Sequence, residues 1–240
     1  MITANILTVN FARAGIAECV EYALQLMERE GCAYVTAPDS ELMQQMQGNK
    51  SLYRAVRKAD MILPAGNGIL LASRILGTPV PERVCALDFA TALLARMSER
   101  EMHVFVLGDD YRLIELAREH LAERYPGLRI SSGDTEYYSN EMELADVLRD
   151  AGADLLLLGM DSPRQELWMY RHREELSHGL MLGLGEGMKV YAGLTQRAPK
   201  RWRDSGFEWL YWVFQEPRLL VRTGKRSWIV FAALWRRIFG

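Results

Sequence analysis

Residues 154–166, DLLLLGMDSPRQE, combine the signals of a buried strand with those of a helix start. The run 154–158 is short and almost wholly apolar, as in strands that are buried on both faces of a parallel sheet. Gly159 permits a sharp turn after it. Ser162 then has the features of a helix cap, with a proline next and Gln165 three residues beyond it. The stretch predicts a strand that leads directly into a helix.

The same alternation of strand and helix patterns continues through most of the chain. The expected strands are 6–9, 32–36, 61–63, 103–107, 128–131, 154–158 and 180–185. The expected helices are 16–27, 41–46, 69–76, 89–97, 113–125, 142–151 and one from Ser162 to about His178. Strands that alternate with helices of this length indicate βαβ units, so an α/β fold with a mostly parallel sheet is predicted.

Charge is distributed unevenly along the 240 residues. The whole chain has a formal net charge of −2 and is 49% hydrophobic, which excludes wholesale disorder. Residues 195–240 have ten Lys/Arg and three Asp/Glu, a net charge of +7, so the remainder has a net charge of −9. This change in composition predicts a body at 1–194 and a C-terminal appendage at 195–240.

The cysteines and histidines favour neither a disulfide framework nor a metal site. The three cysteines are widely spaced, which suits a reducing cytosol. The four histidines have no metal-ligand spacing, and the pair Asp109–Asp110 has no further acidic neighbours, so a metal there is a minority interpretation. The N-terminus has no signal-peptide pattern, and no apolar run is long enough to span a bilayer.

Glycine or small polar residues follow several expected strands. In a parallel sheet these positions share one edge, where helix N-termini offer free N–H groups to phosphates. A single such loop can equally need glycine only for its turn. GLGEGM at 183–188 is an imperfect match to a dinucleotide motif and is weak evidence for such a site, so it does not support the third interpretation, a nucleotide-binding oxidoreductase. Asp88 is a candidate general base or a cap for the helix expected at 89. The strand-end residues are Thr36, Gly66, Asn67, Gly68, Gly108, Gly159 and Gly183–Gly187.

The C-terminal stretch has an aromatic stripe beside basic residues. Trp228, Phe231, Trp235 and Ile238 recur at helical spacing, which predicts a helix lying in a lipid headgroup layer. A helix docked on the body and a homo-oligomer contact are the alternatives. Nucleic-acid binding is disfavoured, because the body is acidic and the cations border an apolar stripe. The flanking basic residues are Arg222, Lys225, Arg226, Arg236 and Arg237.

In the order and spacing of its motifs, the chain resembles the TagA/WecG/CpsF family of bacterial glycosyltransferases, glycosyltransferase family 26. The resemblance runs from about Thr36 to Arg222. Its motifs are PERV at 81–84 with Asp88, YPGL at 125–128, Gly159 with PRQE at 163–166, Gly193 with RAP at 197–199, and EWLY at 208–211 with EP at 216–217.

The resemblance implies a Rossmann-like, doubly wound body that binds a UDP-sugar, with a helical appendage that supplies arginines and membrane contacts. It implies transfer to a polyprenyl-diphosphate-linked sugar, with inversion and without a cofactor or required metal, at the cytoplasmic face of the membrane. The substrate-binding residues it implies are Thr36, Gly66, Asn67, Gly68, Arg83, Gln165, Glu166, Arg197, Arg218 and Arg222. The membrane-associating residues are Lys225, Arg226, Trp228, Phe231, Trp235, Arg236 and Arg237.

The chain departs from the family pattern where the chemistry would occur. The family loop D-G-x-G, whose Asp is thought to be the general base, begins here with Ala65. Lys189 replaces another usual Asp, and Trp212 and Leu219 replace usual arginines. Asp88 is the candidate stand-in base. The alternative is a non-catalytic subunit that binds nucleotide-sugar or lipid carrier, because alanine cannot accept a proton.

Overall fold

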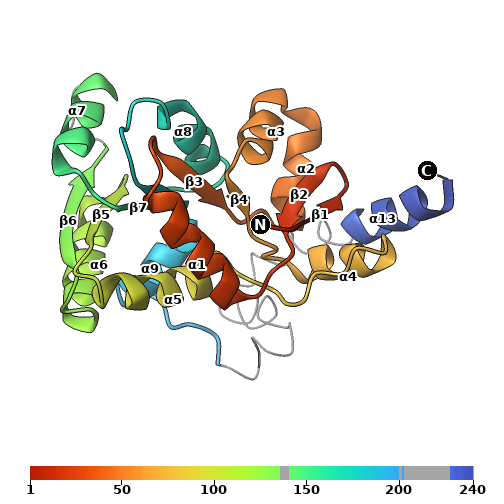
Figure 1. Ribbon diagram of the computed structural model, residues 1–240, viewed down its shortest axis with the longest axis horizontal. Helices are drawn as coiled ribbons and strands as arrows, with labels where there is room; N and C mark the ends of the chain where they lie inside the picture. The colour runs from red at the N-terminus through yellow and green to blue at the C-terminus, as the bar shows by residue number, and fades with distance from the viewer. Residues whose placement is uncertain (136–140, 200–201, 203–227, 240) are drawn as a thin grey trace.

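A computed structural model describes residues 1–135, 141–199, 202 and 228–239. Its centre is a six-stranded sheet in the order β4-β3-β8-β7-β5-β6, and every neighbouring pair is parallel. Helices flank the sheet (Figure 1), which confirms the predicted α/β fold. The strands are β3 (Ala33–Thr36), β4 (Met61–Ile62), β5 (His103–Gly108), β6 (Arg129–Asp134), β7 (Leu155–Gly159) and β8 (Leu180–Gly183).

Side chains alternate between two apolar layers, one on each face of the sheet. Leu155 and Leu157 of β7 contribute to one core cluster, whereas Leu156 and Leu158 contribute to the other. This period of two follows from the pleat of a strand, and it makes the run at 154–158 apolar throughout. The helices are α1 (Ile16–Met27), α2 (Ser40–Gly48), α3 (Lys50–Arg57), α4 (Asn67–Ile75), α5 (Ala86–Ser98), α6 (Tyr111–Arg124), α7 (Glu141–Ala151), α8 (Arg164–His172), the 3-10 turn η1 (Gly185–Gly187), α9 (Met188–Tyr191) and α13 (Trp228–Phe239).

The N-terminal strand prediction at 6–9 is wrong. The segment is the turn of an antiparallel hairpin between β1 (Thr3–Ile6) and β2 (Val9–Ala12). Leu7 and Thr8 form the turn with φ of 48° and 76°, a left-handed conformation that such side chains rarely adopt. Because the turn contains neither Gly nor Asn, the sequence looked like continuous strand.

The start and the end of α8 differ from the prediction. Ser162 does not cap the helix, because its hydroxyl donates to the Glu166 carboxylate at 2.9 Å and Pro163 occupies the cap position after a cis peptide bond. The helix ends at His172 and not near His178. In addition, α3 had no predicted counterpart, although Leu52, Ala55 and Val56 in its sequence KSLYRAVR are buried at helical spacing.

The C-terminal helix α13 packs on the body through one face. Ile229 and Ala233 are fully buried against α4 and α2, and Trp228 Nε1 donates to the Ser40 carbonyl at 2.8 Å. Phe231 and Trp235 lie on the other face and are 70% and 67% exposed. Within the described ranges, no helix is long and apolar enough to cross a membrane. The predicted site and membrane residues Arg218, Arg222, Lys225 and Arg226 lie outside those ranges.

Candidate functional site

The strand ends of the sheet lie at a single edge because all six strands are parallel. Gly108 of β5 pairs with Gly159 of β7, and Leu158 of β7 pairs with Gly183 of β8, so these strands end at the same level. The connection after β5 leads to β6 on one side, whereas the connection after β7 leads to β8 on the other. Ligands in open α/β sheets bind beside such a change of direction, so this edge is the candidate site.

Gln165 joins two of these loops. Its side-chain Oε1 accepts a hydrogen bond from the Gly185 N–H at 3.0 Å, and its Nε2 donates to the Glu166 carboxylate at 2.9 Å. Gly183 makes room for the amide, since a Cβ at this position would lie 2.5 Å from Gln165 Cδ. The loop after β8 and the first turn of α8 are therefore held together by one buried amide.

Glu166 is a buried carboxyl group at this edge. Its side chain is 2% exposed and accepts hydrogen bonds from Ser162 and Gln165. Burial raises its pKa, and the negative charge of Asp39 raises it further. Asp39 itself caps α2 by accepting from two backbone N–H groups. A carboxyl group in these surroundings can retain a proton more readily than an exposed glutamate.

Thr36 presents a buried hydroxyl at the end of β3. The residue is 2% exposed, and its Oγ1 has no hydrogen-bond partner within the described part of the chain. Its carbonyl accepts from the Leu63 N–H at 2.8 Å and so links β3 to the loop after β4. Buried hydroxyl groups are rarely left unpaired, so Thr36 is a candidate hydrogen-bonding group for a ligand.

A second cluster surrounds the first turn of α5. Arg197 Nη2 lies 2.6 Å from Asp88 Oδ2, and the Cys85 thiol donates to the same oxygen at 2.8 Å. Burial raises the pKa of Cys85 to about 11, and the neighbouring Asp88 charge adds to the effect. The predicted helix-capping role of Asp88 is wrong, because α5 begins at Ala86 and Asp88 lies within its first turn.

Short backbone contacts bring this second cluster to the same edge. The Val84 N–H donates to the Pro64 carbonyl at 3.1 Å, which fixes the segment containing Arg83 beside the loop after β4. A Cβ on Gly187 would lie 3.8 Å from the Leu87 side chain, so η1 packs on the start of α5. Of the predicted substrate-binding residues, those in the described ranges belong to this edge: Thr36, Gly66, Asn67, Gly68, Arg83, Gln165, Glu166 and Arg197.

Ala65 occupies the loop after β4. Its N–H donates to the Leu63 carbonyl at 2.9 Å, which closes a tight turn before α4. Its methyl group can neither accept a proton nor bind a cation. Of the carboxyl groups at this edge, Asp39 caps α2, whereas Asp88 lies beside an arginine and Glu166 lies away from solvent. These two groups are the candidates for acid–base chemistry at this edge.

Three contributing residues were missed by sequence reasoning. Cys85 was noted only as a thiol, although it binds Asp88, and Asp39 had a helix-cap signal that was not used. Arg164 pairs with Asp109 at 2.7 Å between the loops after β7 and β5. The Thr135 hydroxyl also donates to Asp109. The two contacts of Asp109 join residues far apart in the chain, so local patterns do not reveal them.

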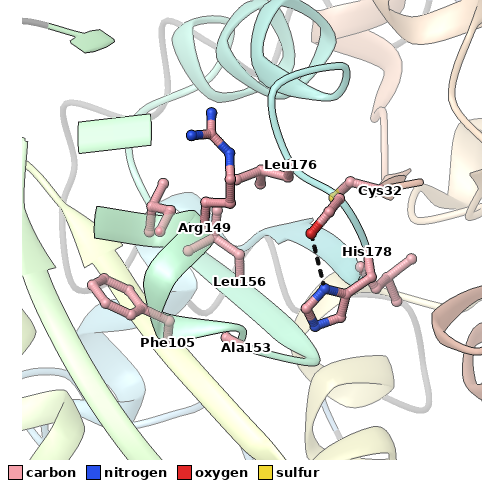
Figure 2. Close-up of a pocket in the computed structure, with 10 residues that line it drawn as sticks. Cys32, Phe105, Arg149, Ala153, Leu156, Leu176 and His178 are labelled. Carbon is pink, nitrogen blue, oxygen red and sulfur yellow. Dashed lines mark hydrogen bonds between the residues drawn. The ribbon is translucent and has the colours of Figure 1, made fainter. Parts of the chain in front are cut away.

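A small cavity lies at the opposite, amino edge of the sheet (Figure 2). Its volume is about 20 Å³, and its walls include Cys32, Phe105, Leu156 and His178. This is space for about one water molecule. The cavity is separate from the strand-end loops and is too small for a sugar nucleotide.

Comparison with known proteins identifies the family of the chain. The model of the glycosyl transferase WecG/TagA/CpsF family matches residues 4–240. The chain is 28% identical over 193 residues to an N-acetylglucosaminyldiphosphoundecaprenol N-acetyl-beta-D-mannosaminyltransferase of Bacillus spizizenii, covering 80% of this chain and 74% of the relative. It is 23% identical over 209 residues to the Staphylococcus aureus protein of the same description, covering 86% and 82%. The chain therefore belongs to the WecG/TagA/CpsF family of glycosyl transferases.

Proposed function

We propose that the protein transfers a sugar from a UDP-sugar to a polyprenyl-diphosphate-linked sugar in the synthesis of a cell-surface polymer, with inversion and without a cofactor or metal. Family membership supports the reaction class, and the names of the two relatives support a lipid-linked acceptor. The observation that carries the proposal is the gathering of strand-end loops at one edge, with a buried carboxyl and an arginine–carboxylate pair beside them.

The first cluster suits the nucleotide-sugar. The Thr36 hydroxyl can bind a polar group of the ligand, while Gln165 and Glu166 position the neighbouring loops. Gly66, Asn67 and Gly68 precede or begin α4, where backbone N–H groups face the N-terminal end of the helix and favour phosphate. Together these groups would bind the donor.

The second cluster suits the diphosphate and the acceptor hydroxyl. Arg83 and Arg197 would neutralise phosphate charge through their planar guanidinium groups, together with Arg218 and Arg222 from the appendage. Asp88 would act as base, because its partly exposed carboxylate lies at this edge and is held in place by Arg197 at 2.6 Å.

A binding subunit without catalytic activity is the second candidate. It is favoured by Ala65, which leaves the turn after β4 without an ionisable side chain. Removal of a general base usually costs on the order of 10²–10⁴-fold in rate. Such a protein would still bind the sugar nucleotide through the first cluster.

Release of UDP separates the two candidates. If the protein is an active transferase, UDP should be released when UDP-sugars and a polyprenyl-diphosphate sugar are both supplied. The D88N substitution should abolish this release. D150N is the matched control, since Asp150 is an exposed carboxylate on α7. UDP-sugar binding without turnover would favour the binding subunit, and a fully active D88N variant would remove Asp88 as the base.

We further propose that the protein is peripheral on the inner face of the cytoplasmic membrane. The exposed Phe231, Trp235 and Ile238 side chains on α13 support this placement, as do Arg236 and Arg237 at its end. Deletion of residues 227–240 should move the protein from the membrane fraction to the soluble fraction. An unchanged distribution would contradict the anchor.

A further inference from the structure

A groove lies between α13, the hairpin turn and the helices α2 and α3. Its volume is about 430 Å³. The hairpin turn, α2 with the start of α3, and α13 form its walls, and these elements gather at the end of the molecule opposite β6 (Figure 1). The lining residues are Leu7, Thr8, Val9, Met43, Met46, Gln47, Lys50, Tyr53, Trp228 and Arg236.

The floor of the groove is apolar and elongated. Met43 and Met46 are each 4% exposed, and flexible methionines adapt to irregular apolar ligands. Trp228 is held at one end by its hydrogen bond to Ser40, whereas Arg236 lies eight residues further along α13. At a rise of 1.5 Å per residue the groove extends for roughly 12 Å, which is long enough for part of a hydrocarbon chain.

Two cations lie along this apolar groove without a resolved partner. Lys50 and Arg236 are exposed, and neither has an ion pair or side-chain hydrogen bond among the described residues. No acidic side chain contributes to the described lining. On a protein whose residues outside the appendage have a net negative charge, this pair of cations indicates recognition of an anion.

The surface next to the groove is also apolar. Phe231, Trp235 and Ile238 project from the face of α13 that points away from the body, with exposed fractions of 67–70%. The hairpin turn adds the partly exposed Leu7 in a strained left-handed conformation. Contiguous apolar exposure beside cations is typical of a lipid surface contact.

We propose that this groove binds one anionic phospholipid, with an acyl chain against Met43, Met46 and Trp228 and with the headgroup phosphate at Lys50 and Arg236. Charge complementarity selects an anionic headgroup, and the apolar floor selects an attached chain. The site is distinct from the acceptor site, because Arg236 lies near the end of α13 opposite Trp228, and Lys50 follows the end of α2 opposite Ser40 and the strand-end loops. The groove would make α2, α3 and the hairpin part of the membrane contact. The proposal does not depend on sugar transfer.

Titration with a short-chain lipid tests the proposal on the full chain without any sugar nucleotide. Monomeric dioctanoyl phosphatidylglycerol should bind one-to-one in native mass spectrometry, and dioctanoyl phosphatidylcholine should bind at least about tenfold more weakly. K50E and R236E should each weaken phosphatidylglycerol binding by about tenfold, since each cation near an anionic lipid contributes on the order of a factor of five and reversal adds repulsion. R129E is the matched control, because Arg129 is exposed on β6 at the other edge of the sheet.

A second pair of variants tests chain occupancy without changing charge. Q47W places a large side chain in the groove and should abolish binding, whereas Q45W adds the same side chain to an exposed position of α2 outside the groove and should not. Equal binding of both lipids, or unchanged binding in K50E, R236E and Q47W, would overturn the proposal. If the protein binds no lipid but forms a dimer, and Q47W abolishes the dimer, the groove binds a second copy of the chain. That result would also overturn the proposal.

Discussion

The contact between Gly183 and Gln165 allows a strong test of the site geometry. A methyl group at residue 183 would lie 2.5 Å from Cδ, 2.6 Å from Oε1 and 2.9 Å from Nε2 of Gln165. Ordinary contacts begin at 3.4 Å, so in G183A the amide must move by about 1 Å. Its 3.0 Å hydrogen bond to Gly185 would then stretch to about 4 Å and be lost.

The cost of G183A follows from the groups that lose their partners. Two buried hydrogen bonds are broken, one to the Gly185 N–H and one to Glu166, and each unpaired buried group costs about 1–3 kcal/mol. We therefore expect a loss of about 2–6 kcal/mol in the free energy of unfolding. For a chain of this size that lowers Tm by about 4–24 °C.

Urea and thermal unfolding measure this effect, and G159A is the matched control. Gly159 also ends a strand of the sheet, but a Cβ there would lie 3.0 Å from Met188 Cγ and 3.3 Å from Ile114 Cδ1, so shifts of a few tenths of an ångström suffice and we expect a smaller loss of about 1 kcal/mol. Truncation in Q165A should make the added G183A change less costly, because the clash is gone. If G183A is as stable as G159A, the amide does not occupy the position described.

Three further results are expected. E166Q should be more stable than the parent protein at neutral pH, because burial raises the folded-state pKa of Glu166 and ionisation of this group therefore opposes folding. The difference in stability should shrink as the pH falls below about 4, where the carboxyl group is protonated in both states. Measurement of Tm against pH for both proteins tests this. Alkylation of Cys85 by iodoacetamide at pH 8 should be about a hundredfold slower than that of free cysteine and should accelerate towards its pKa of about 11; equal rates would contradict its burial. A65D should raise the rate of UDP release by about 10²–10⁴-fold if a missing base limits turnover; an unchanged rate would leave that role to Asp88.

The fold could be predicted where one pattern dominated a segment. The apolar run at 154–158 predicted a buried strand, which is β7, and the helical spacing of apolar residues at 16–27 predicted a helix, which is α1. The hairpin was missed because Leu7 and Thr8 adopt a left-handed turn that their side chains disfavour. The turn is stabilised by the packing of the neighbouring residues Ile6 and Val9 in the core, which the local sequence does not show. The start of α8 was misassigned because Ser162 binds a side chain and not the backbone.

The sequence predicted which residues gather at this edge but not their electrostatics. Strand-end glycines and the family motifs pointed to Gln165, Glu166 and Arg197. Burial of Glu166 depends on packing of α8 against the sheet, and no local pattern reports it. The partner of Asp88 is more than 100 residues away in the chain, so only the folded structure identifies the pairing.

The two carboxyl groups at the edge differ in ways that suggest a division of roles. Asp88 is partly exposed and pairs with the Arg197 guanidinium at 2.6 Å, whereas Glu166 is 2% exposed and its pKa is raised by burial. Groups with opposed environments are the usual basis for separate acid and base assignments. We infer that Asp88 is the group placed to accept a proton from the acceptor hydroxyl and that Glu166, when protonated, could donate a hydrogen bond to the ligand. Arginine at residue 197 would then have two functions, since it would attract phosphate and also hold the Asp88 carboxylate in place.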